Sequence, residues 1–302
     1  MVEHKRIRFF PYLIILYEIA VYLSNDMYLP SMPAIAKDLN FSQTQIQDTL
    51  TFWFLGASSM QLILGPISDR FGRKSVLIIG GILFVLSSIL CAMSYSLPVM
   101  LTARFIQGTA ICSLVAAYAA IHELYTTKQA IKLLALIGAI TILAPALGPL
   151  FGALIVQFAH WRYIFWFLVL IGSVSVCSMI FYMPESNTQQ HSLNIKHILR
   201  DYKKIILNID FVIPCLAYCF LVAMYFIWIF ESPFIMMEVF KTSPLDYGIA
   251  QAIIFGCYFI GAAATKWALE HFSVLKLVVM STWLTIAGAV LFVLSSILIN
   301  SI

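Results

Sequence analysis

The chain consists of long apolar runs separated by short polar breaks. A run of about 20 apolar residues spans the hydrocarbon core of a bilayer as an α-helix. These runs are too long and too continuous for the alternating strands of a membrane barrel. The pattern therefore predicts an all-α, polytopic membrane protein. We expect nine spans, at roughly 9–29, 47–66, 75–95, 98–120, 131–157, 162–182, 211–235, 247–268 and 275–299.

The longest polar break, 184–210, divides six predicted spans from three. Within this break, residues 193–206 place apolar side chains at helical spacing, with basic side chains such as Lys203 and Lys204 on the polar side. That pattern is typical of an amphipathic helix that lies on a membrane surface. The predicted organisation is a six-helix bundle at 1–183, a linker at 184–210, and three further helices at 211–302.

The composition agrees with this class, because 62% of the residues are hydrophobic and only 11% are charged. The net charge of +4 does not indicate a nucleic-acid partner, because the basic residues lie in short loops between apolar runs. With the N-terminus inside, fourteen Lys and Arg residues fall in inner segments and three in outer segments. This bias predicts a cytoplasmic N-terminus in the cell's inner membrane. Nine spans then place the C-terminus outside.

The residues offer little support for an enzyme or a metalloprotein. All six cysteines lie inside apolar runs, where small buried hydrophobic side chains are expected. No His or Cys cluster has metal-ligand spacing, so no metal site is predicted. His122 and Glu123 follow the fourth run, but no HExxH, GxSxG or paired aspartyl pattern accompanies them. An intramembrane enzyme is therefore disfavoured.

Four charged residues lie inside the apolar runs: Glu18, Asp26, Arg104 and Glu231. A charge at membrane depth costs at least ~2.5 kcal/mol on insertion scales, so each one needs a reason. Glu18 lies nine residues into the first run, at a depth of about 14 Å, which is near the bilayer midplane. Asp26 lies about 80° further around the same helix, so both acids can face one cavity.

Tyr22 and Asn25 extend these acids into a polar stripe on the first span. We expect Glu18 to be either a structural acid hydrogen-bonded between helices or a site that binds a proton and a cationic substrate in turn. Low dielectric disfavours an ionised carboxyl group, which suits the second role. Arg104 lies at a depth similar to that of Asp26, so an ion pair between them is a second hypothesis. Glu231 is either a snorkelling interfacial acid or a further acid of the cavity.

The loop after the second run carries Gly65, Asp69, Arg70, Gly72 and Arg73. This spacing resembles the signature between the second and third helices of the major facilitator superfamily. Gly65 would permit close helix approach and Gly72 a tight turn. The resemblance implies that Asp69 pairs with a basic group across the cytoplasmic face and holds a gate shut.

The fifth run carries Gly138, Pro145, Gly148, Pro149 and Gly152. Small residues at fixed spacing let a partner helix pack closely, and prolines bend a helix. The pattern resembles the antiporter motif of the drug/proton branch of the superfamily. The stretch from Arg104 to Ala110 resembles a further signature of this branch.

The first run sharpens the resemblance. Its segments 16–18, 24–27 and Pro30 are similar to those of MdfA-type multidrug/proton antiporters. The chloramphenicol/bicyclomycin exporters share the sequence Asp-Met-Tyr-Leu-Pro of residues 26–30. In that family the acids matching Glu18 and Asp26 bind protons and cationic drugs, and the arginine matching Arg104 supports the exchange. The implied substrate site is Glu18, Tyr22, Asn25, Asp26, Arg104 and Glu231.

The resemblance implies a monomeric exporter that needs no cofactor and is driven by the proton gradient. Its partners would be protons, lipophilic cationic or neutral compounds and the lipid bilayer. Such transporters have twelve helices in two six-helix bundles built from three-helix repeats. Nine spans correspond to one complete bundle and the first three helices of the second, so the last three are expected to be missing. The alternative function is a non-transporting remnant or membrane interaction partner.

Overall fold

The computed structural model describes residues 2–187 and 195–300, and within them every regular element is a helix. The chain divides into two compact units, Met1–Ile253 (unit 1) and Ile254–Ile302 (unit 2). The predicted boundary at 184–210 lies inside unit 1, and the division into two bundles stays a prediction.

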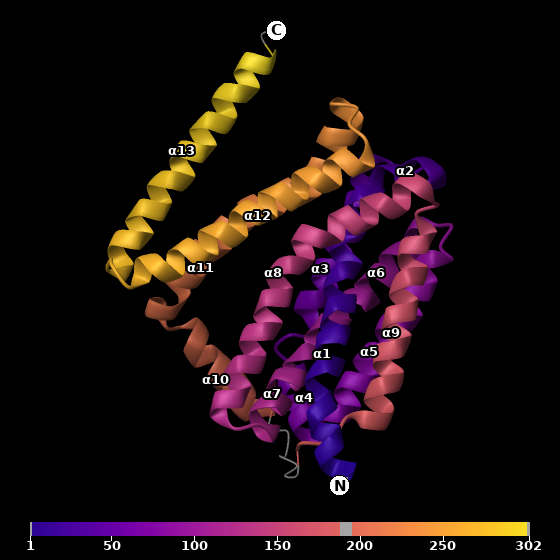
Figure 1. Ribbon diagram of the computed structural model, residues 1–302, viewed down its shortest axis with the longest axis vertical. Helices are drawn as coiled ribbons and strands as arrows, with labels where there is room; N and C mark the ends of the chain where they lie inside the picture. Colours follow the sequence, from indigo (N-terminus) through magenta and orange to yellow (C-terminus); the bar gives the residue numbers. More distant parts are fainter. Residues whose placement is uncertain (1, 188–194, 301–302) are drawn as a thin grey trace. The chain divides into compact units, whose positions relative to one another are not determined.

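Unit 1 is built around a helical bundle. Its long helices are α1 (Val2–Asp26), α3 (Gln43–Ser59), α5 (Arg73–Ala92), α6 (Leu97–Cys112), α8 (Thr127–Phe158) and α9 (Arg162–Tyr182). α1 runs between α8 and α9, and α5 packs against both α6 and α9 (Figure 1). This arrangement makes α1 an interior helix, so its polar side chains lie among other helices.

Two glycines let α3 and α6 approach each other closely. A Cβ atom at Gly56 would overlap the main-chain oxygen of Phe105, and one at Gly108 would overlap that of Trp53. Main chains can approach this closely only where side chains are absent, which is a recurrent way of packing helices in membranes. The contact fixes α6, and therefore Arg104, against its neighbours.

Short helices and breaks interrupt two of the predicted spans. α4 (Leu64–Phe71) follows α3 after a break of four residues and is bent from it by 52°. α7 (Leu114–Leu124) follows α6 after Ser113. The hydroxyl groups of Tyr17 and Ser113 lie 2.9 Å apart, and Tyr17 also donates to the Ala110 carbonyl. Tyr17, the residue before Glu18, thus satisfies polar groups where the fourth span is interrupted at Ser113.

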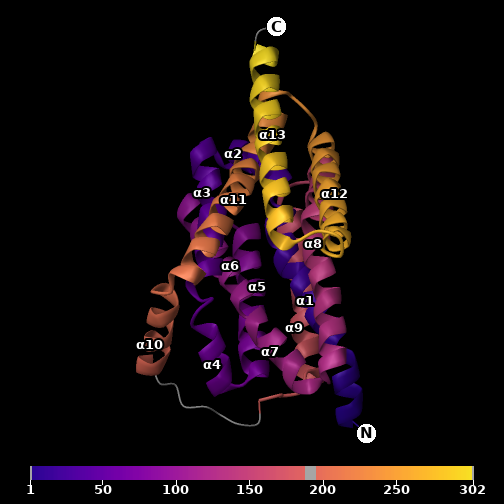
Figure 2. The same ribbon diagram turned by 90° about the vertical axis from the view of Figure 1, so that its left-hand side faces the viewer.

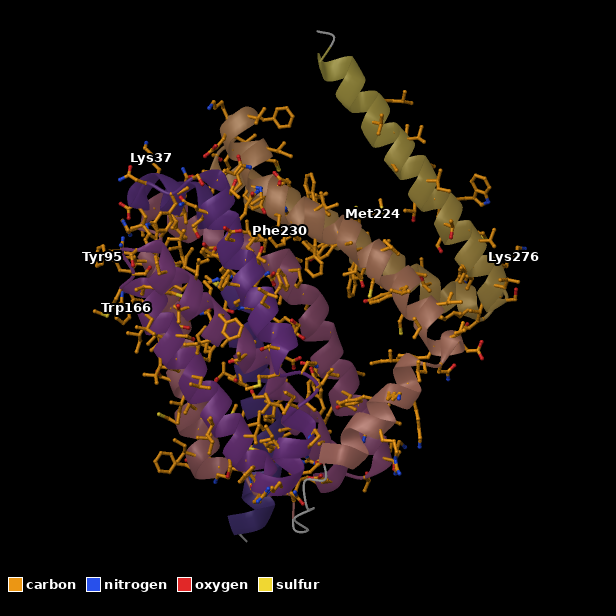
Figure 3. The ribbon with its side chains drawn as sticks, turned by 180° about the vertical axis from the view of Figure 1, so that it is seen from behind. Lys37, Tyr95, Trp166, Met224, Phe230 and Lys276 are labelled. Carbon is orange, nitrogen blue, oxygen red and sulfur yellow. The ribbon has the colours of Figure 1, made fainter. Side chains whose placement is uncertain are left out.

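The end of unit 1 that carries residues 65–73 is named the motif end, and the end that carries α2 (Met32–Leu39), after the 3-10 turn Leu29–Ser31, is named the α2 end. Beyond the six-span bundle, unit 1 contains α10 (Ile195–Ile206), α11 (Ile209–Phe234), the π-helical turn Ile235–Val239 and the start of α12 (Pro244–Leu269). α11 contacts α2 and α3, and Figure 2 shows these helices side by side. Phe230, labelled in Figure 3, stacks on Phe54 of α3 at this contact.

Unit 2 contains the end of α12 and all of α13 (Val274–Asn300). Among its described side chains, large apolar residues such as Tyr258, Trp283 and Leu291 are exposed. Such surfaces are typical of helices that face lipid or other helices rather than water. The described side chains of unit 2 are therefore mostly apolar and exposed, and few of them are buried in a core within the unit.

The helices agree with the predicted runs. Each of the nine runs overlaps a described helix or two consecutive described helices. Seven helices are long and apolar enough to cross a membrane, or eight if the α3–α4 pair is one span, among the residues described. α1 is outside this set, and its apolar run is interrupted by Glu18, Asn25 and Asp26. The chain is a multi-pass membrane protein.

Candidate functional site

Glu18 is the most deeply enclosed acid of the bundle. Its side chain has no exposed surface, and its Oε1 atom accepts a hydrogen bond of 2.8 Å from the Tyr118 hydroxyl on α7. The hydrogen bond joins α1 to α7 through a neutral donor, so the acid is held between two helices.

Asn25 and Asp26 are the last two residues of α1, and this end of the helix packs against α8, the fifth span. The Asn25 amide donates to Asp26 Oδ1 at 3.4 Å, and both residues are buried. A Cβ atom at Gly148 of α8 would overlap the Asp26 Cβ, and one at Gly152 would overlap the Met27 main chain. The predicted close packing of the antiporter motif is therefore confirmed at these two glycines, and its partner is the acid-bearing end of α1.

Other residues of this motif contribute differently. Among the residues that the structure describes, nothing lies within 4 Å of a Cβ placed on Gly138, so the predicted close packing is not seen there. α8 remains helical through Pro145 and Pro149 and changes direction along its length (Figure 1). Gly248 of α12 packs on the same segment, where an added Cβ would lie 3.0 Å from the Leu150 Cα. The motif thus contacts α1 on one side and α12 on another.

Arg104 is fully buried, but it does not pair with Asp26. Its Nη1 atom donates to the Ser24 carbonyl at 2.9 Å and to Gln107 Oε1 at 2.6 Å. No ion pair joins Arg104 to Asp26 in the described part of the chain. The predicted ion pair is therefore wrong. Ser24 and Asp26 lie about 200° apart around α1, so the side that faces Arg104 is not the side that faces α8.

The surroundings of Arg104 explain how its charge is tolerated. Its guanidinium carbon lies 4.3 Å from the ring centroid of Tyr28 and 5.9 Å from that of Trp53. Gln107 in turn donates to Ser88 at 2.8 Å. A desolvated cation over an aromatic face gains about 2 kcal/mol or more. The arginine is thus held by dipoles and π-systems, and two of its nitrogens have no hydrogen-bond partner among the described residues.

Glu231 lies on α11 and is half-buried. The Gln43 amide of α3 donates to Glu231 Oε2 at 3.4 Å, and the Gln47 amide donates to the Phe230 carbonyl. The acid is therefore part of the contact between α11 and α3 near the α2 end. The neighbouring Ser232 belongs to a buried cluster in which Gln251 donates to both Ser232 and Tyr247 at 3.0 Å.

The signature loop at the motif end forms a dense ionic cluster. Gly72 has φ +93°, which confirms the predicted tight turn between α4 and α5. Asp69 Oδ1 lies 2.5 Å from Arg73 Nη1, and Glu123 Oε1 lies 3.0 Å from Arg73 Nη2. The basic partner of Asp69 is thus a residue of the same motif.

Two further residues of the signature loop behave less as expected. A Cβ on Gly65 would meet Val115 at an ordinary 3.9 Å, so the predicted close approach there is wrong. Arg70 is exposed and lies over the ring of Phe71.

The start of the linker completes this cluster. Glu185 accepts hydrogen bonds from the main-chain N–H groups of Arg73 and Lys74 at 2.9 and 3.2 Å. The Ser186 hydroxyl donates to Glu123 Oε2 at 2.6 Å. An acid at the first N–H groups of a helix satisfies donors that the helix itself cannot. The linker is therefore attached to the signature loop at its first residues.

The α2 end has its own, more exposed ionic contact. Asp38 accepts from the Trp161 indole at 3.0 Å and from Arg162 Nη1 at 2.9 Å. The hydrogen bond from Trp161 and the adjacent Arg162 guanidinium hold the pKa of Asp38 below its usual range. Arg162 also stacks on Tyr95, which lines a surface pocket with Trp166 (Figure 3). These contacts tie α2 to α9.

The structure brings some predicted site residues together and separates others. Glu18 contacts α7 and Asp26 packs against α8, and the prediction that both acids face one cavity stays a prediction. Tyr22 is half-buried between them along α1, whereas Glu231 lies at the contact with α3. No group of three or more His, Cys, Asp or Glu side chains gathers as a metal site in the described ranges.

Two residues of the site were missed from the sequence. Tyr118 looks like an ordinary aromatic residue in an apolar run, and its link to Glu18 joins positions 100 residues apart. Gln107 had a usable signal, because it lies three residues after Arg104 and therefore on the same face of α6.

A known protein family and several curated proteins are similar to this chain. A model described as the Major Facilitator Superfamily matches residues 14–302. The chloramphenicol resistance protein CraA of Acinetobacter baumannii is 32% identical over 286 residues, covering 94% of this chain and 69% of CraA. The multidrug transporter MdfA of Yersinia pestis is 33% identical, covering 85% of this chain and 63% of MdfA. The multidrug resistance protein MdtM of Salmonella typhimurium is 31% identical, covering 83% and 62%.

Solved structures share the fold. A bacterial homologue of the human lysosomal transporter Spinster superposes with a TM-score of 0.68 at 13% identity, covering 88% of this chain and 64% of that chain. The human organic anion transporter MFSD10 gives a TM-score of 0.61 at 17% identity, covering 82% and 70%. The chain spans 62% to 69% of the length of the curated relatives named above.

Proposed function

The chain belongs to the Major Facilitator Superfamily, a family of transporters rather than enzymes, and we propose that it carries the proton- and drug-binding part of a multidrug efflux antiporter. Sequence similarity to multidrug and chloramphenicol resistance transporters supports drug export. We place the N-terminus in the cytoplasm from the distribution of basic residues. The driving force is the proton gradient, so no cofactor is required.

The observation that carries this proposal is the setting of Glu18. The carboxyl group is fully buried on an interior helix, and the hydrogen bond described for it comes from the neutral Tyr118 hydroxyl. An acid at this depth is costly unless it has a task. Binding of a lipophilic cation stabilises the ionised form, whereas an empty site favours the protonated form. One residue thereby makes proton and substrate compete.

The neighbouring residues give this exchange a route to the rest of the bundle. Asp26 supplies a second acid at the other end of the stripe, pressed against the glycines of α8. Tyr118 lies on α7 and Arg104 on α6, the two parts of one broken span. A change at Glu18 therefore acts on the helix whose other half holds Arg104. Alternating access uses such rigid-body shifts of packed helices.

The substrate class follows from the chemistry of the stripe. An acid in apolar surroundings selects lipophilic cations, and the aromatic side chains of Tyr22 and Tyr118 also accept neutral compounds. CraA is named for chloramphenicol resistance, and MdfA for the transport of many drugs. We propose the same range of lipophilic cationic or neutral compounds for this chain.

A binding experiment tests the proposal without requiring complete transport. Purified chain in detergent is titrated with tetraphenylphosphonium between pH 5 and 8, and affinity is measured by equilibrium dialysis. We expect affinity to fall as the pH falls, because protons occupy Glu18. Glu18→Gln should abolish both binding and its pH dependence, whereas Glu270→Gln, at an exposed acid, should leave both unchanged. Unchanged pH-dependent binding in folded Glu18→Gln would refute the assignment.

A further inference from the structure

The bend in the second span leaves a main-chain carbonyl without its helical partner. α3 ends at Ser59, α4 begins at Leu64, and the two are bent by 52°. In a continuous helix the Leu62 carbonyl would accept from the N–H of residue 66. Residue 66 is proline, which has no N–H. This main-chain carbonyl therefore needs a donor from outside its own helix.

The donor comes from the linker helix. The Tyr202 hydroxyl of α10 donates to the Leu62 oxygen at 2.6 Å, across 140 residues of sequence. Among the described residues, no main-chain N–H group donates to the Leu62 oxygen, so Tyr202 supplies its hydrogen bond. Tyr202 therefore occupies the position that Pro66 leaves open. This hydrogen bond attaches α10 to the bend.

The rest of α10 has the chemistry of a membrane surface. Arg200, Lys203 and Lys204 are exposed and lie within about 100° of one another around the helix, opposite Tyr202. Ile205 and Ile206, which flank the tyrosine face, are 44% and 70% exposed. Apolar residues on one face and basic residues on the other are the requirements of a helix at an anionic lipid surface. Figure 2 shows α10 at the same end of unit 1 as α4.

We propose that α10 binds the headgroups of anionic phospholipids through Arg200, Lys203 and Lys204, and that Tyr202 transmits this binding to the α3–α4 bend. The positive charges complement the negative surface of the leaflet at the motif end. Lipid binding fixes the orientation of α10, and the hydroxyl then holds Leu62 and the bend in one geometry. The proposal does not depend on drug export, because it concerns a different part of unit 1.

Hydrogen exchange in lipid nanodiscs tests both steps. The full chain is placed in phosphatidylcholine discs with or without phosphatidylglycerol, and exchange of the amides at 61–67 is followed by mass spectrometry. We expect phosphatidylglycerol to slow this exchange. The double variant Arg200→Gln/Lys203→Gln should weaken binding of fluorescent phosphatidylglycerol about 30-fold and remove the effect on exchange. The control Lys241→Gln, an exposed basic residue in the loop before α12, should leave both unchanged.

The variant Tyr202→Phe separates lipid binding from transmission. It keeps the ring and loses only the donor, so it should bind phosphatidylglycerol as the parent does but lose the slowing of exchange at 61–67. A parent chain that does not distinguish the two lipids, or a double variant that still does, overturns the lipid site. A Tyr202→Phe chain with full protection at the bend overturns the transmission. Competition by inorganic phosphate at equal concentration would show a free-anion site and would also contradict the proposal.

Discussion

Two buried arginines of the bundle, Arg73 and Arg104, are stabilised by different kinds of partner. Arg73, at the motif end, lies between the carboxylates of Asp69 and Glu123. Arg104, inside the bundle, is held by a carbonyl, an amide and two aromatic rings. Glu18 follows the second pattern, with a hydrogen bond from a neutral tyrosine.

The difference shows how the bundle separates fixed charges from exchangeable ones. At the motif end, paired charges fasten a loop, a helix start and the first residues of the linker into one cluster. Inside the bundle, a full ion pair would fix the protonation states of its members. A hydrogen bond from a neutral donor such as Tyr118 stabilises a charge less than an ion pair does, and we propose that Glu18 takes up a proton or a cation there. The ionic cluster at the motif end thus suits a structural role, whereas the interior of the bundle suits the proposed exchange of a proton for a cation.

The largest effect is expected from Arg104→Ala. The substitution removes two hydrogen bonds and leaves a cavity beside α1, so we expect a loss of about 3 kcal/mol in the free energy of unfolding. Denaturation in mixed micelles, followed by circular dichroism, measures it. Raising the salt concentration should hardly alter this loss, since the site is buried. If Arg104→Ala lowered the free energy of unfolding by less than Arg73→Ala does, the contrast drawn between the two arginines would be wrong.

Gly148→Leu should have the next largest effect. Its side chain would displace Asp26 and separate α8 from α1, with an expected cost of about 1–3 kcal/mol from overpacking. Binding of tetraphenylphosphonium should be lost as well, because the acidic end of the stripe moves. Gly138→Leu in the same helix is the matched control, and open space at that position predicts no change in stability or binding. Equal effects at both glycines would contradict the close α1–α8 contact.

Arg73→Ala should cost less, about 1 kcal/mol, because the half-exposed carboxylates of its cluster can be solvated when the arginine is absent. The loss should shrink as salt concentration rises, since screening weakens the ion pairs of the parent protein. Thermal unfolding at low and high salt measures both quantities. Arg70→Ala is the control, because this exposed arginine makes no ion pair among the described residues. A salt-independent loss would indicate that Arg73 acts by packing.

The smallest effect concerns Asp38 at the α2 end. Its pKa is lowered in the folded protein by the Trp161 hydrogen bond and by Arg162, so the unfolded chain binds its proton more tightly. The stabilisation is therefore complete above the unfolded pKa, near 4, and disappears as the pH falls through the folded value. We expect less than about 1 kcal/mol, because the pair is partly exposed. Asp38→Asn should flatten this part of the stability–pH curve, and an unchanged curve would contradict the assignment.

The sequence predicted the helices well because membrane depth imposes a simple length rule on apolar runs. It also predicted the turn at Gly72 and the close packing at Gly148, since glycine spacing reports local geometry. It failed for Arg104 because equal depth does not place two side chains on facing sides of their helices. Tyr118 was missed for a related reason: a tyrosine in an apolar run carries no sign of its partner. The depth of a residue in the membrane can be predicted from the sequence. Which neighbouring helix its side chain faces depends on how the helices pack, and the sequence alone does not give this.

The central claim is that Glu18 exchanges a proton for a cationic substrate. Infrared difference spectroscopy of the purified chain, with and without tetraphenylphosphonium, measures this exchange directly through the carbonyl band of a protonated carboxylic acid. The account predicts that the substrate removes one such band and that Glu18→Gln lacks the change, whereas Glu270→Gln retains it. A difference band that persists in Glu18→Gln, or substrate binding without any loss of a protonated carboxyl group, would contradict the account.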